Sequence, residues 1–416
     1  MTNFKITELQ NGIRIISENI SHVKSFSLGF WFDVGSRDEK KNNNGISHFL
    51  EHMFFKGTVK RNARKISDDI ESLGGYLNAF TSKEHTCFYG RGLAHNLEKT
   101  FDVLSDMIQN SLFKESEIRK EAGVVIDELN DIEDSPEELI FDKFETDLFQ
   151  GNTLSLPIIG TQKNLNKFTR ENLLDYIDKN YCFNNFYIVA SGAVDHQKLI
   201  DLTKKYITKP LGMTGKKRKL PELSAAKELF VYKDILQSHF IIGKPTYGFR
   251  NKERSGVSVF SQILGEGSSS RLFQSVREKN GIAYQINSFL NSFLDISTFG
   301  LYFSTNEKSV DRALSLVYDE FKKLKSKKVS DRELKRAKEY LKGSIIMSLE
   351  NTTNRMVRAG NSMIYFNRIR TLEETIRDIE AVSKDTILDL ANELLDDKSL
   401  NKVLIGSRNL FLRSAV

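Results

Sequence analysis

The chain has 416 residues, of which 39% are hydrophobic and 28% charged, a composition typical of a water-soluble globular protein. Its length predicts two or three domains, and no apolar run approaches the about 20 residues that would span a bilayer. The net charge of +6 comes mainly from scattered lysines, so we interpret it as a solvated surface and not as a nucleic-acid site.

Two further features bear on the compartment. Cys87 and Cys182 are the only cysteines, which argues against a disulfide framework and favours a reducing environment. Residues 1–6 show neither an apolar signal core nor an Arg-rich amphipathic leader. We therefore expect a cytoplasmic bacterial protein, with a processed protein of the mitochondrial matrix as the alternative.

The first half of the chain alternates strand and helix patterns. Asn11-Gly12 between two apolar runs predicts a hairpin, and the aromatic-rich residues 26–32 predict a strand. Further strands are expected at 76–80, 85–90 and 186–190, and helices at about 66–73, 95–110, 115–133, 136–149 and 169–180. Residues 209–228 combine prolines, glycines and a basic run, so their composition predicts a linker.

The stretch from Gly45 to Phe55 carries the strongest chemical signal. His48, Glu51 and His52 stand at i, i+3 and i+4, so on a helix they share one face, while apolar residues cover the others. Two neutral imidazoles one turn apart can bind zinc, and a neighbouring carboxylate can take a proton from a water molecule that the metal activates. This H-x-x-E-H pattern is the inverse of the zinc protease signature H-E-x-x-H. The plainer alternative is a surface helix with two histidines by chance.

A third ligand is expected on the acidic helix that follows Ser116. Glu121 and Glu128 stand seven residues apart, which places them two turns along one helix face. Either carboxylate can complete a tetrahedral site with the two histidines, and the other can orient a histidine or the substrate. Periodicity does not choose between them.

The second half of the chain repeats the first. Phe32–Arg37 corresponds to Pro245–Arg250, and Glu117–Lys120 corresponds to Glu333–Arg336. With a loop two residues shorter, the positions of His48, Glu51 and His52 fall on Val259, Gln262 and Ile263. We interpret this as a duplicated domain in which one half has no metal site.

Several motifs together resemble the pitrilysin (insulinase-type) metallopeptidases, with particular likeness to the β subunit of the mitochondrial processing peptidase and its bacterial relatives. The likeness covers nearly the whole chain and rests on five stretches: His48–Thr58 with Glu128 following 76 residues after His52, Leu77–Ser82, Leu156–Gly160, Ser269–Phe273 and Val276–Tyr284. It implies an α+β fold of two homologous domains, each a mainly antiparallel sheet covered by helices, forming a clamshell. The implied ranges are 1–208 for a zinc-bearing catalytic domain, 209–228 for the linker and 229–416 for an inactive domain that contributes substrate-binding residues.

The same resemblance implies roles for individual residues. One Zn²⁺ per chain would be held by His48, His52 and Glu128, with Glu51 as the general base and Glu121 as a supporting catalytic carboxylate. The residues implied in substrate binding are Asn78 and Ala79 on an edge strand, Phe55 in the pocket after the cut, Glu138 and Asp142 for a substrate arginine, and Arg277 and Tyr284 from the second domain. The plainer interpretation of Asn78 and Ala79 is an ordinary core strand, and that of Glu138 and Asp142 is a solvated acidic helix.

The predicted function is that of a zinc-dependent endopeptidase. We expect it to cleave peptides or unfolded presequence-like segments in extended form inside an enclosed chamber. The resemblance implies a dimer whose second chain is identical or an inactive homologue. The competing hypotheses are a non-catalytic structural or assembly subunit of the same family and a metal-independent peptide-binding chaperone.

Overall fold

The computed structural model describes residues 4–209, 211–213, 215 and 217–411, and these form two compact units. The first unit combines residues up to Asn130 with Leu156–Lys219 and Met347–Thr371. The second combines Asp131–Ser155, Leu220–Ile346 and the residues from Leu372 onward. The units therefore differ from the continuous ranges 1–208 and 229–416, because each half of the sequence lends one segment to the other unit.

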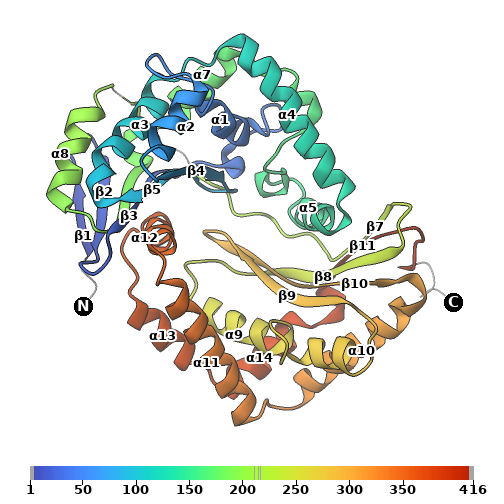
Figure 1. Ribbon diagram of the computed structural model, residues 1–416. Coiled ribbons are helices and arrows are strands. Elements are labelled where there is room, and N and C mark those ends of the chain that lie inside the picture. Colours follow the sequence, from blue (N-terminus) through green and yellow to red (C-terminus); the bar gives the residue numbers. More distant parts are fainter. Residues whose placement is uncertain (1–3, 210, 214, 216, 412–416) are drawn as a thin grey trace. The chain divides into compact units, whose positions relative to one another are not determined.

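A six-stranded sheet forms the centre of the first unit (Figure 1). Its spatial order is β1-β2-β6-β3-β5-β4, in which β2 and β6 run parallel and all other neighbours run antiparallel. The strands are β1 (Phe4–Glu8), β2 (Arg14–Asn19), β3 (Ser25–Phe32), β4 (Tyr76–Thr81), β5 (Thr86–Leu93) and β6 (Phe186–Gly192). Because β4 is the last strand, one of its edges has no neighbour within the sheet.

Helices surround this sheet, and their positions follow the predicted ones closely. They are α1 (Ile46–Phe54), α2 (Ala63–Glu71), α3 (Leu97–Asn110), α4 (Glu115–Asp134), α6 (Gln162–Leu165), α7 (Arg170–Asn180), α8 (His196–Tyr206) and α12 (Thr352–Phe366). The predicted end of α2 is present, since Gly74 adopts a positive φ of 68° just after the helix.

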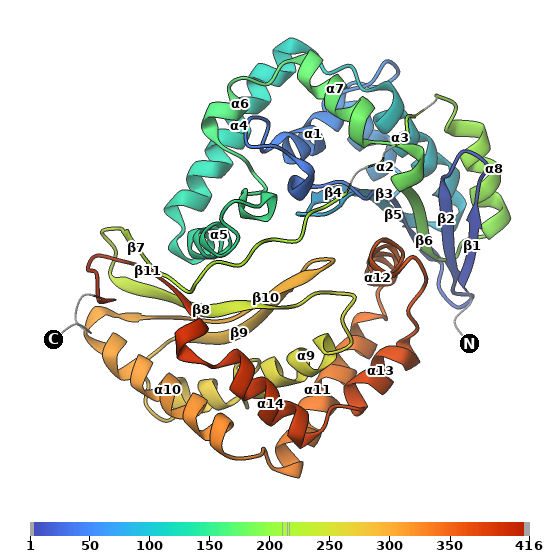
Figure 2. The same cartoon turned by 180° about the vertical axis from the view of Figure 1, so that it is seen from behind.

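The alternating side chains of β3 bury both faces of the first sheet. On one face Phe30 packs edge-on against Phe101 of α3, with ring centroids 5.0 Å apart. On the other face Trp31 donates from Nε1 to Sδ of Met356 in α12 at 3.2 Å. Gly360 lets that helix approach, because a Cβ there would lie 2.6 Å from the Trp31 ring. Helix α12 thus completes the first core although it comes from the second half of the sequence (Figure 2).

The second unit repeats this topology with five strands. Its order is β7-β11-β8-β10-β9, with β7 and β11 parallel and the other neighbours antiparallel. The strands are β7 (Glu228–Tyr232), β8 (Gln237–Tyr247), β9 (Gln285–Ser292), β10 (Ile296–Asn306) and β11 (Asn401–Gly406). The same sequence of parallel and antiparallel neighbours occurs in the first sheet from β2 to β4, which is the pattern expected of a duplicated domain.

Two apolar layers cover the second sheet. One face packs Ile241, Tyr302 and Val403 against Leu139, Ile140 and Phe144 of α5 (Pro136–Leu148), a helix from the first half of the sequence. The other face packs against α9 (Arg254–Leu264), α10 (Val310–Ser326), α11 (Asp331–Ser348), α13 (Leu372–Glu380) and α14 (Lys384–Leu394). Each half of the sequence thus supplies one helix to the sheet built by the other half. Helix α12 packs on β3 and β6 of the first sheet, and α5 packs on the equivalent strands β8 and β11 of the second.

Helix α9 occupies the place in the second unit that α1 holds in the first. The positions aligned with the histidines, Val259 and Ile263, are buried in the core, and Gln262 donates to the backbone oxygen of Glu266. Two aliphatic side chains and one amide therefore occupy α9 where α1 carries two histidines and a carboxylate.

The predicted linker contains no helix or strand among its described residues before β7 begins at Glu228. Pro210, Thr214 and Lys216 lie outside the described residues. No helix within the described ranges is both long enough and apolar enough to cross a membrane.

Candidate metal centre

Helix α1 is held at its N-terminus by a buried acid. Glu39 accepts hydrogen bonds from the backbone N–H of Gly45 at 2.7 Å and of Ser47 at 2.8 Å, and from the Asn44 side chain at 2.9 Å. These bonds satisfy N–H groups that a helix start otherwise leaves without acceptors. The apolar face of α1 is buried through Phe49, Leu50 and Met53, so the histidine face is the one left for chemistry.

The helix entry is braced by the predicted motif Leu156–Gly160. Gly45 and Gly160 both have positive φ, 97° and 88°, and lie so close that a Cβ on Gly160 would be 2.6 Å from Cα of Gly45. Asn164 donates to the backbone oxygens of Lys41 and Asn44, and Asn44 donates to that of Pro157. Only glycine fits at either position without moving the backbone that precedes the histidines.

Replacing Glu39 with Ala is expected to lower the free energy of unfolding by about 2–4 kcal/mol, because two buried backbone N–H groups lose their acceptor. Burial raises the pKa of Glu39 to about 7, against the lowering effect of the N–H donors from Ser47 and Gly45. The folded form therefore holds a proton between pH 4.5 and 7 that the unfolded form has lost, so the contribution of Glu39 to stability falls as pH rises. Urea unfolding should show the larger wild-type advantage at pH 5 and a smaller one at pH 8. Exposed Glu171→Ala is the control, and equal stability of the two variants would contradict the capping role.

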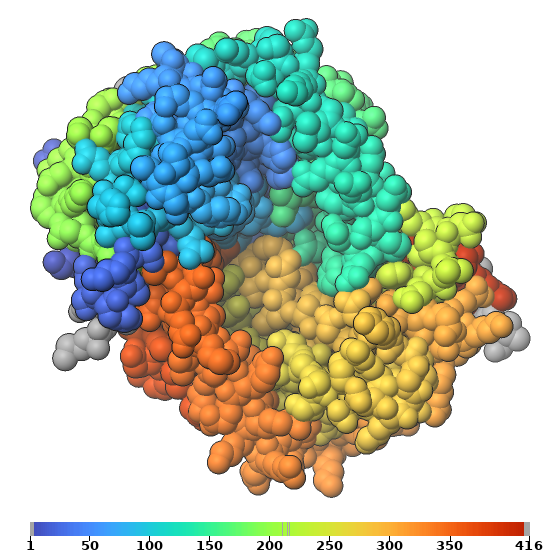
Figure 3. All heavy atoms as spheres, viewed as in Figure 1, coloured from blue at the N-terminus to red at the C-terminus, as the bar shows by residue number. Residues whose placement is uncertain are grey.

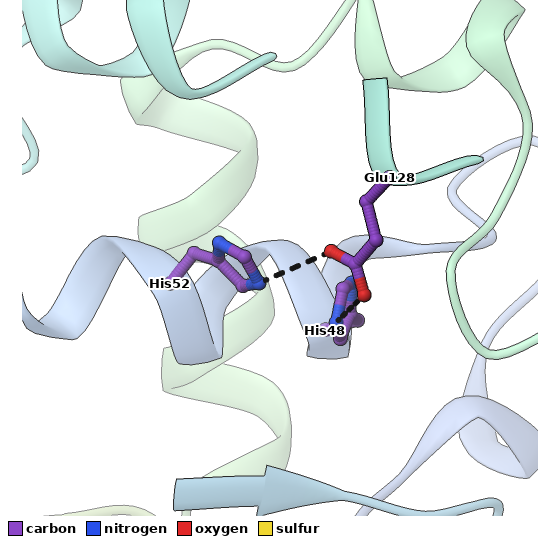
Figure 4. A group of neighbouring side chains, drawn as sticks. All are labelled: His48, His52 and Glu128. Carbon is purple, nitrogen blue, oxygen red and sulfur yellow. Dashed lines mark ion pairs between the residues drawn. The ribbon is translucent and has the colours of Figure 1, made fainter. Parts of the chain in front are cut away.

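Three side chains converge beside α1. Nε2 of His48 lies 3.7 Å from one carboxylate oxygen of Glu128, and Nε2 of His52 lies 3.6 Å from the other. Figure 4 shows both imidazoles, one turn apart on α1, pointing toward the Glu128 carboxylate from α4. These three residues are the only group within the described ranges whose His, Cys, Asp and Glu ligand atoms meet in this way.

This donor set fits a zinc ion. Two ligand atoms that each lie about 2.1 Å from one tetrahedral ion are about 3.4 Å apart. The distances of 3.7 and 3.6 Å between the Nε2 atoms and the Glu128 oxygens are close to this value. Burial, together with the positive charge of His52, lowers the pKa of His48 to about 4, so its imidazole is neutral at neutral pH, as a ligand must be. With three protein ligands, a fourth position is left for water or substrate, as in catalytic zinc sites.

Glu121 supports His52 from behind. Its Oε1 lies 2.9 Å from Nδ1 of His52, and its Oε2 accepts from the Lys56 ammonium at 2.6 Å. An N–H at Nδ1 leaves the Nε2 lone pair facing Glu128, which is the tautomer a metal requires. Burial alone would lower the pKa of His52, but its hydrogen bond to Glu121 and the charges of Glu121, Glu128 and Glu51 outweigh burial and raise it. Of the two acids that periodicity left open, Glu128 meets both Nε2 atoms and Glu121 meets Nδ1.

Replacing Glu121 with Gln is expected to weaken metal binding about 10- to 100-fold, because Nδ1 of His52 loses a charged acceptor. Competition with a chromogenic zinc chelator measures the affinity. Glu117→Gln, one turn earlier on α4 and outside the cluster, is the control. Unchanged affinity in Glu121→Gln would contradict the orienting role.

Glu51 lies on the same helix and is held by β4. Thr81 donates from Oγ1 to Oε2 of Glu51 at 2.6 Å. The pKa of Glu51 is raised, and burial is the largest cause. The charge of Glu128 raises it further, whereas the hydrogen bond from Thr81 and the charge of His52 lower it without reversing the shift. A carboxylate with a raised pKa is better suited to accept a proton near neutral pH than a solvated one.

Thr81→Val is expected to move the acid limb of the pH profile of kcat/KM for peptide cleavage to higher pH. The variant keeps the shape of Thr81 but removes the hydrogen bond that lowers the pKa of Glu51, so the ionised base appears only at higher pH. Activity at pH 6 should fall severalfold and recover at pH 9. Thr203→Val, which removes a hydroxyl bonded to Leu199 within α8, is the control. An unmoved acid limb would show that Thr81 does not set the protonation of the base.

The other predicted residues of the first unit lie near α1 and along β4. Phe55 is the half-buried residue that follows α1 directly. Asn78 is exposed on β4, and its Oδ1 accepts the backbone N–H of Ala79 at 2.9 Å. Ala79 is buried, and β4 has a free edge within the described sheet, which is the arrangement that an added peptide strand requires.

Four predicted substrate-binding residues belong to the second unit. Glu138 and Asp142 lie one turn apart on α5, which covers the second sheet. The Arg277 guanidinium stacks over the rings of Phe273 at 4.7 Å and Tyr284 at 5.0 Å, and Tyr284 is 79% exposed. The structure brings Arg277 and Tyr284 together, and their relation to the metal ligands stays a prediction.

Sequence reasoning missed three residues of the site. Thr81 and Lys56 belong to the motifs Leu77–Ser82 and His48–Thr58, which implied no role for either residue, and Glu39 lies in the polar stretch before the histidine helix. The spacing of Lys56 offered a signal, because it follows His52 by four residues and so continues the same helix face. Thr81 and Glu39 gave no local signal, since their partners lie 30 and 8 residues away in the sequence.

Comparison with known proteins agrees with this geometry. Residues 14–162 match the family model described as Insulinase (Peptidase family M16), and residues 167–341 match the model described as Peptidase M16 inactive domain. The chain belongs to the M16 peptidase family. The predicted resemblance is confirmed, and so is the α+β fold with two similar domains.

Several M16 relatives align along almost the full chain. A Rickettsia felis protein named as an uncharacterized zinc protease is 35% identical over 409 residues, covering 98% of both chains. A Bacillus subtilis protein of the same description is 33% identical, covering 96% of this chain and 98% of its own. The mitochondrial-processing peptidase subunit beta of Saccharomyces cerevisiae is 31% identical, covering 97% of this chain and 91% of its own. A protease structure from Helicobacter pylori shares the fold, with a TM-score of 0.91, 22% identity, and coverage of 97% of this chain and 99% of that one.

Proposed function

We propose that this M16 protein is a zinc-dependent endopeptidase. The observation that carries the proposal is the convergence of His48, His52 and Glu128, with Glu51 one helical turn from His48. The names of the relatives support zinc as the metal. Bound zinc supplies Lewis acidity that polarises the scissile carbonyl and lowers the pKa of water toward neutrality.

In this proposal the chain's own residues carry the proton and hold the site in place. Glu51 takes a proton from the attacking water and delivers it to the amine nitrogen that leaves, so it returns ionised for the next cycle. Thr81 fixes one oxygen of Glu51 and leaves the other for this work. Glu121 keeps His52 in the tautomer that presents Nε2.

For substrates we propose peptides or unfolded presequence-like segments bound in extended form. The free edge of β4 supports this, because a peptide can add to it as a further strand through main-chain hydrogen bonds. Asn78, Ala79 and Phe55 would contact the peptide from the first unit. In the same proposal Arg277 and Tyr284 contact it from the second unit, and Glu138 with Asp142 recognise a substrate arginine. A second chain, identical or homologous, would enclose the chamber.

The experiment combines metal analysis with peptide cleavage. We expect about one zinc per chain, and cleavage of an internally quenched, arginine-containing peptide that stops with chelator and returns with zinc. Protein without bound zinc and without cleavage would overturn the proposal. Zinc without cleavage would favour the non-catalytic assembly subunit, unless co-purification with a homologous partner restores activity.

A further inference from the structure

A pocket lined in part by Lys56, which follows α1, lies within the first unit. It has a volume of about 460 Å³ and lies between the α1–α2 connection and the start of α4. Near the top of Figure 3, the blue surface of the α1–α2 region lies beside the teal surface of α4. The residues that line it include five cations, Lys56, Lys60, Arg61, Arg64 and Lys114, and a single acid, Glu117.

The five cations are not equally available to a ligand. Arg61 is buried and bonds to Asp69, Asp102 and Asp106 at 2.8, 2.5 and 2.7 Å, so it forms part of the wall. Lys56 bonds to Glu121, and Arg64 makes an exposed pair with Asp68 at 3.4 Å. Within the described ranges Lys60 and Lys114 are exposed and make no ion pair. In the described part of the chain, two ammonium groups at this pocket are therefore without an ion-pair partner.

The backbone adds to this positive character. Helix α2 begins at the pocket, where Asn62 caps the N–H of Lys65 at 2.8 Å. The N–H groups of Ala63 and Arg64 have no acceptor in the described part of the chain. The free N–H groups and the dipole at a helix start both favour an anion.

Lys56 connects this pocket to the metal centre. It follows His52 by four residues, one turn further along the direction of α1. Its ammonium lies 2.6 Å from Oε2 of Glu121, whose Oε1 contacts Nδ1 of His52. A ligand in the pocket therefore shares a cation with the residues that orient a metal-binding histidine.

We propose that this pocket binds an anionic group, a carboxylate or a phosphate. The group is supplied either by an acidic residue of the peptide near the cut or by free inorganic phosphate. The first source rests on the proposed peptidase function, whereas anion binding itself does not. Either source predicts binding that weakens as salt increases, because the lysines concerned are exposed.

The test uses the zinc-loaded full chain and a double variant, Lys60→Gln with Lys114→Gln. Its control, Lys41→Gln with Lys163→Gln, removes the same charge from exposed positions of the first unit outside the pocket. Isothermal titration with inorganic phosphate at low ionic strength gives the Kd. We expect wild type and control to agree and the pocket variant to bind about tenfold more weakly, since two charge-assisted contacts are lost.

A second arm identifies the source of the anion. Quenched peptides are compared in pairs with Asp or Asn at each of three positions on either side of the cut. If one Asp peptide has a higher kcat/KM than its Asn counterpart, and this difference disappears only in the pocket variant, the pocket binds an acidic residue of the substrate. If the pocket variant loses phosphate binding and no Asp peptide is preferred, the pocket binds free phosphate.

Equal phosphate binding by all three proteins, with no peptide preference altered, would overturn the pocket proposal. Phosphate that binds equally well to the pocket variant has bound elsewhere, for instance at the zinc. If the wild type cuts no peptide and no homologous partner restores cleavage, the peptidase proposal fails, and the titration still decides whether the pocket binds anions.

Discussion

Glu51→Gln is expected to reduce kcat/KM for peptide cleavage by about 10²- to 10⁴-fold, the range typical for loss of a general base. The amide has nearly the same shape as the carboxylate and can still accept a hydrogen bond from Thr81, but it cannot take a proton from water. Glu51 is not one of the three residues whose ligand atoms converge, so the zinc content and zinc affinity should stay at the wild-type level. Steady-state kinetics and chelator competition measure the two quantities on the same preparation.

Stability provides an internal control for this variant. Burial raises the pKa of Glu51, which means that its ionised form is disfavoured in the folded protein. A neutral side chain avoids this penalty, so the free energy of unfolding should be unchanged or higher in Glu51→Gln. Exposed Glu71→Gln on α2 serves as the matched substitution. A variant that keeps wild-type activity would assign the base elsewhere, and one that loses zinc would make Glu51 part of the metal site.

Arg218→Met is expected to lower the free energy of unfolding of the first unit by about 3–5 kcal/mol, because it removes a buried cation that pairs with Asp33 and with buried Asp38. The Arg218 side chain is 6% exposed and lies 2.7 Å from Asp33 and 2.9 Å from Asp38. It also donates to the backbone oxygen of Glu84, whose carboxylate pairs with Arg37 at 2.6 Å. Removal of Arg218 takes a positive charge away from Asp33 and Asp38, whereas Met replaces only its volume.

Denaturant unfolding of Arg218→Met is compared with that of Lys217→Met, an exposed change one residue away. Limited proteolysis adds a local measurement, since Arg37 also donates to the backbone oxygen of Lys219 and so holds this end of the predicted linker. We expect cleavage near residue 218 only in Arg218→Met. Equal unfolding midpoints in the two variants would show that the buried network does not stabilise this segment.

Local patterns predicted much of the fold because neighbouring residues determine them. The hairpin at Gly12, the strand of residues 26–32 and the helices near 97–110 and 170–180 follow from turn chemistry and apolar periodicity. The internal repeat predicted the second unit, and the two sheets share their order of neighbours. The pairing of His48 with His52 was also local, since four residues make one turn of a helix.

Contacts between residues far apart in the sequence could not be predicted from local patterns. The apolar faces of α5 and α12 predict burial but do not say on which sheet, and each helix packs on the sheet that the other half of the sequence builds. A basic run within residues 209–228 predicts a solvated linker, yet Arg218 is buried because Asp33, Asp38 and Glu84 surround it. Such partners lie more than 130 residues away in the sequence, so no window of it contains them.

At the metal centre, too, local patterns predicted some features and tertiary packing decided others. The sequence by itself determined a helix with two histidines and a carboxylate on one face, because 3.6 residues per turn align i, i+3 and i+4. Periodicity left Glu121 and Glu128 equivalent, since both lie on one face of α4, and the resemblance to the family implied Glu128 as the ligand. The tertiary structure gives the physical reason for their different positions: Glu128 meets both Nε2 atoms, and Glu121 meets Nδ1 of His52 and the Lys56 ammonium. Periodicity aligns residues within one helix, whereas the packing of two helices decides which carboxylate reaches which nitrogen.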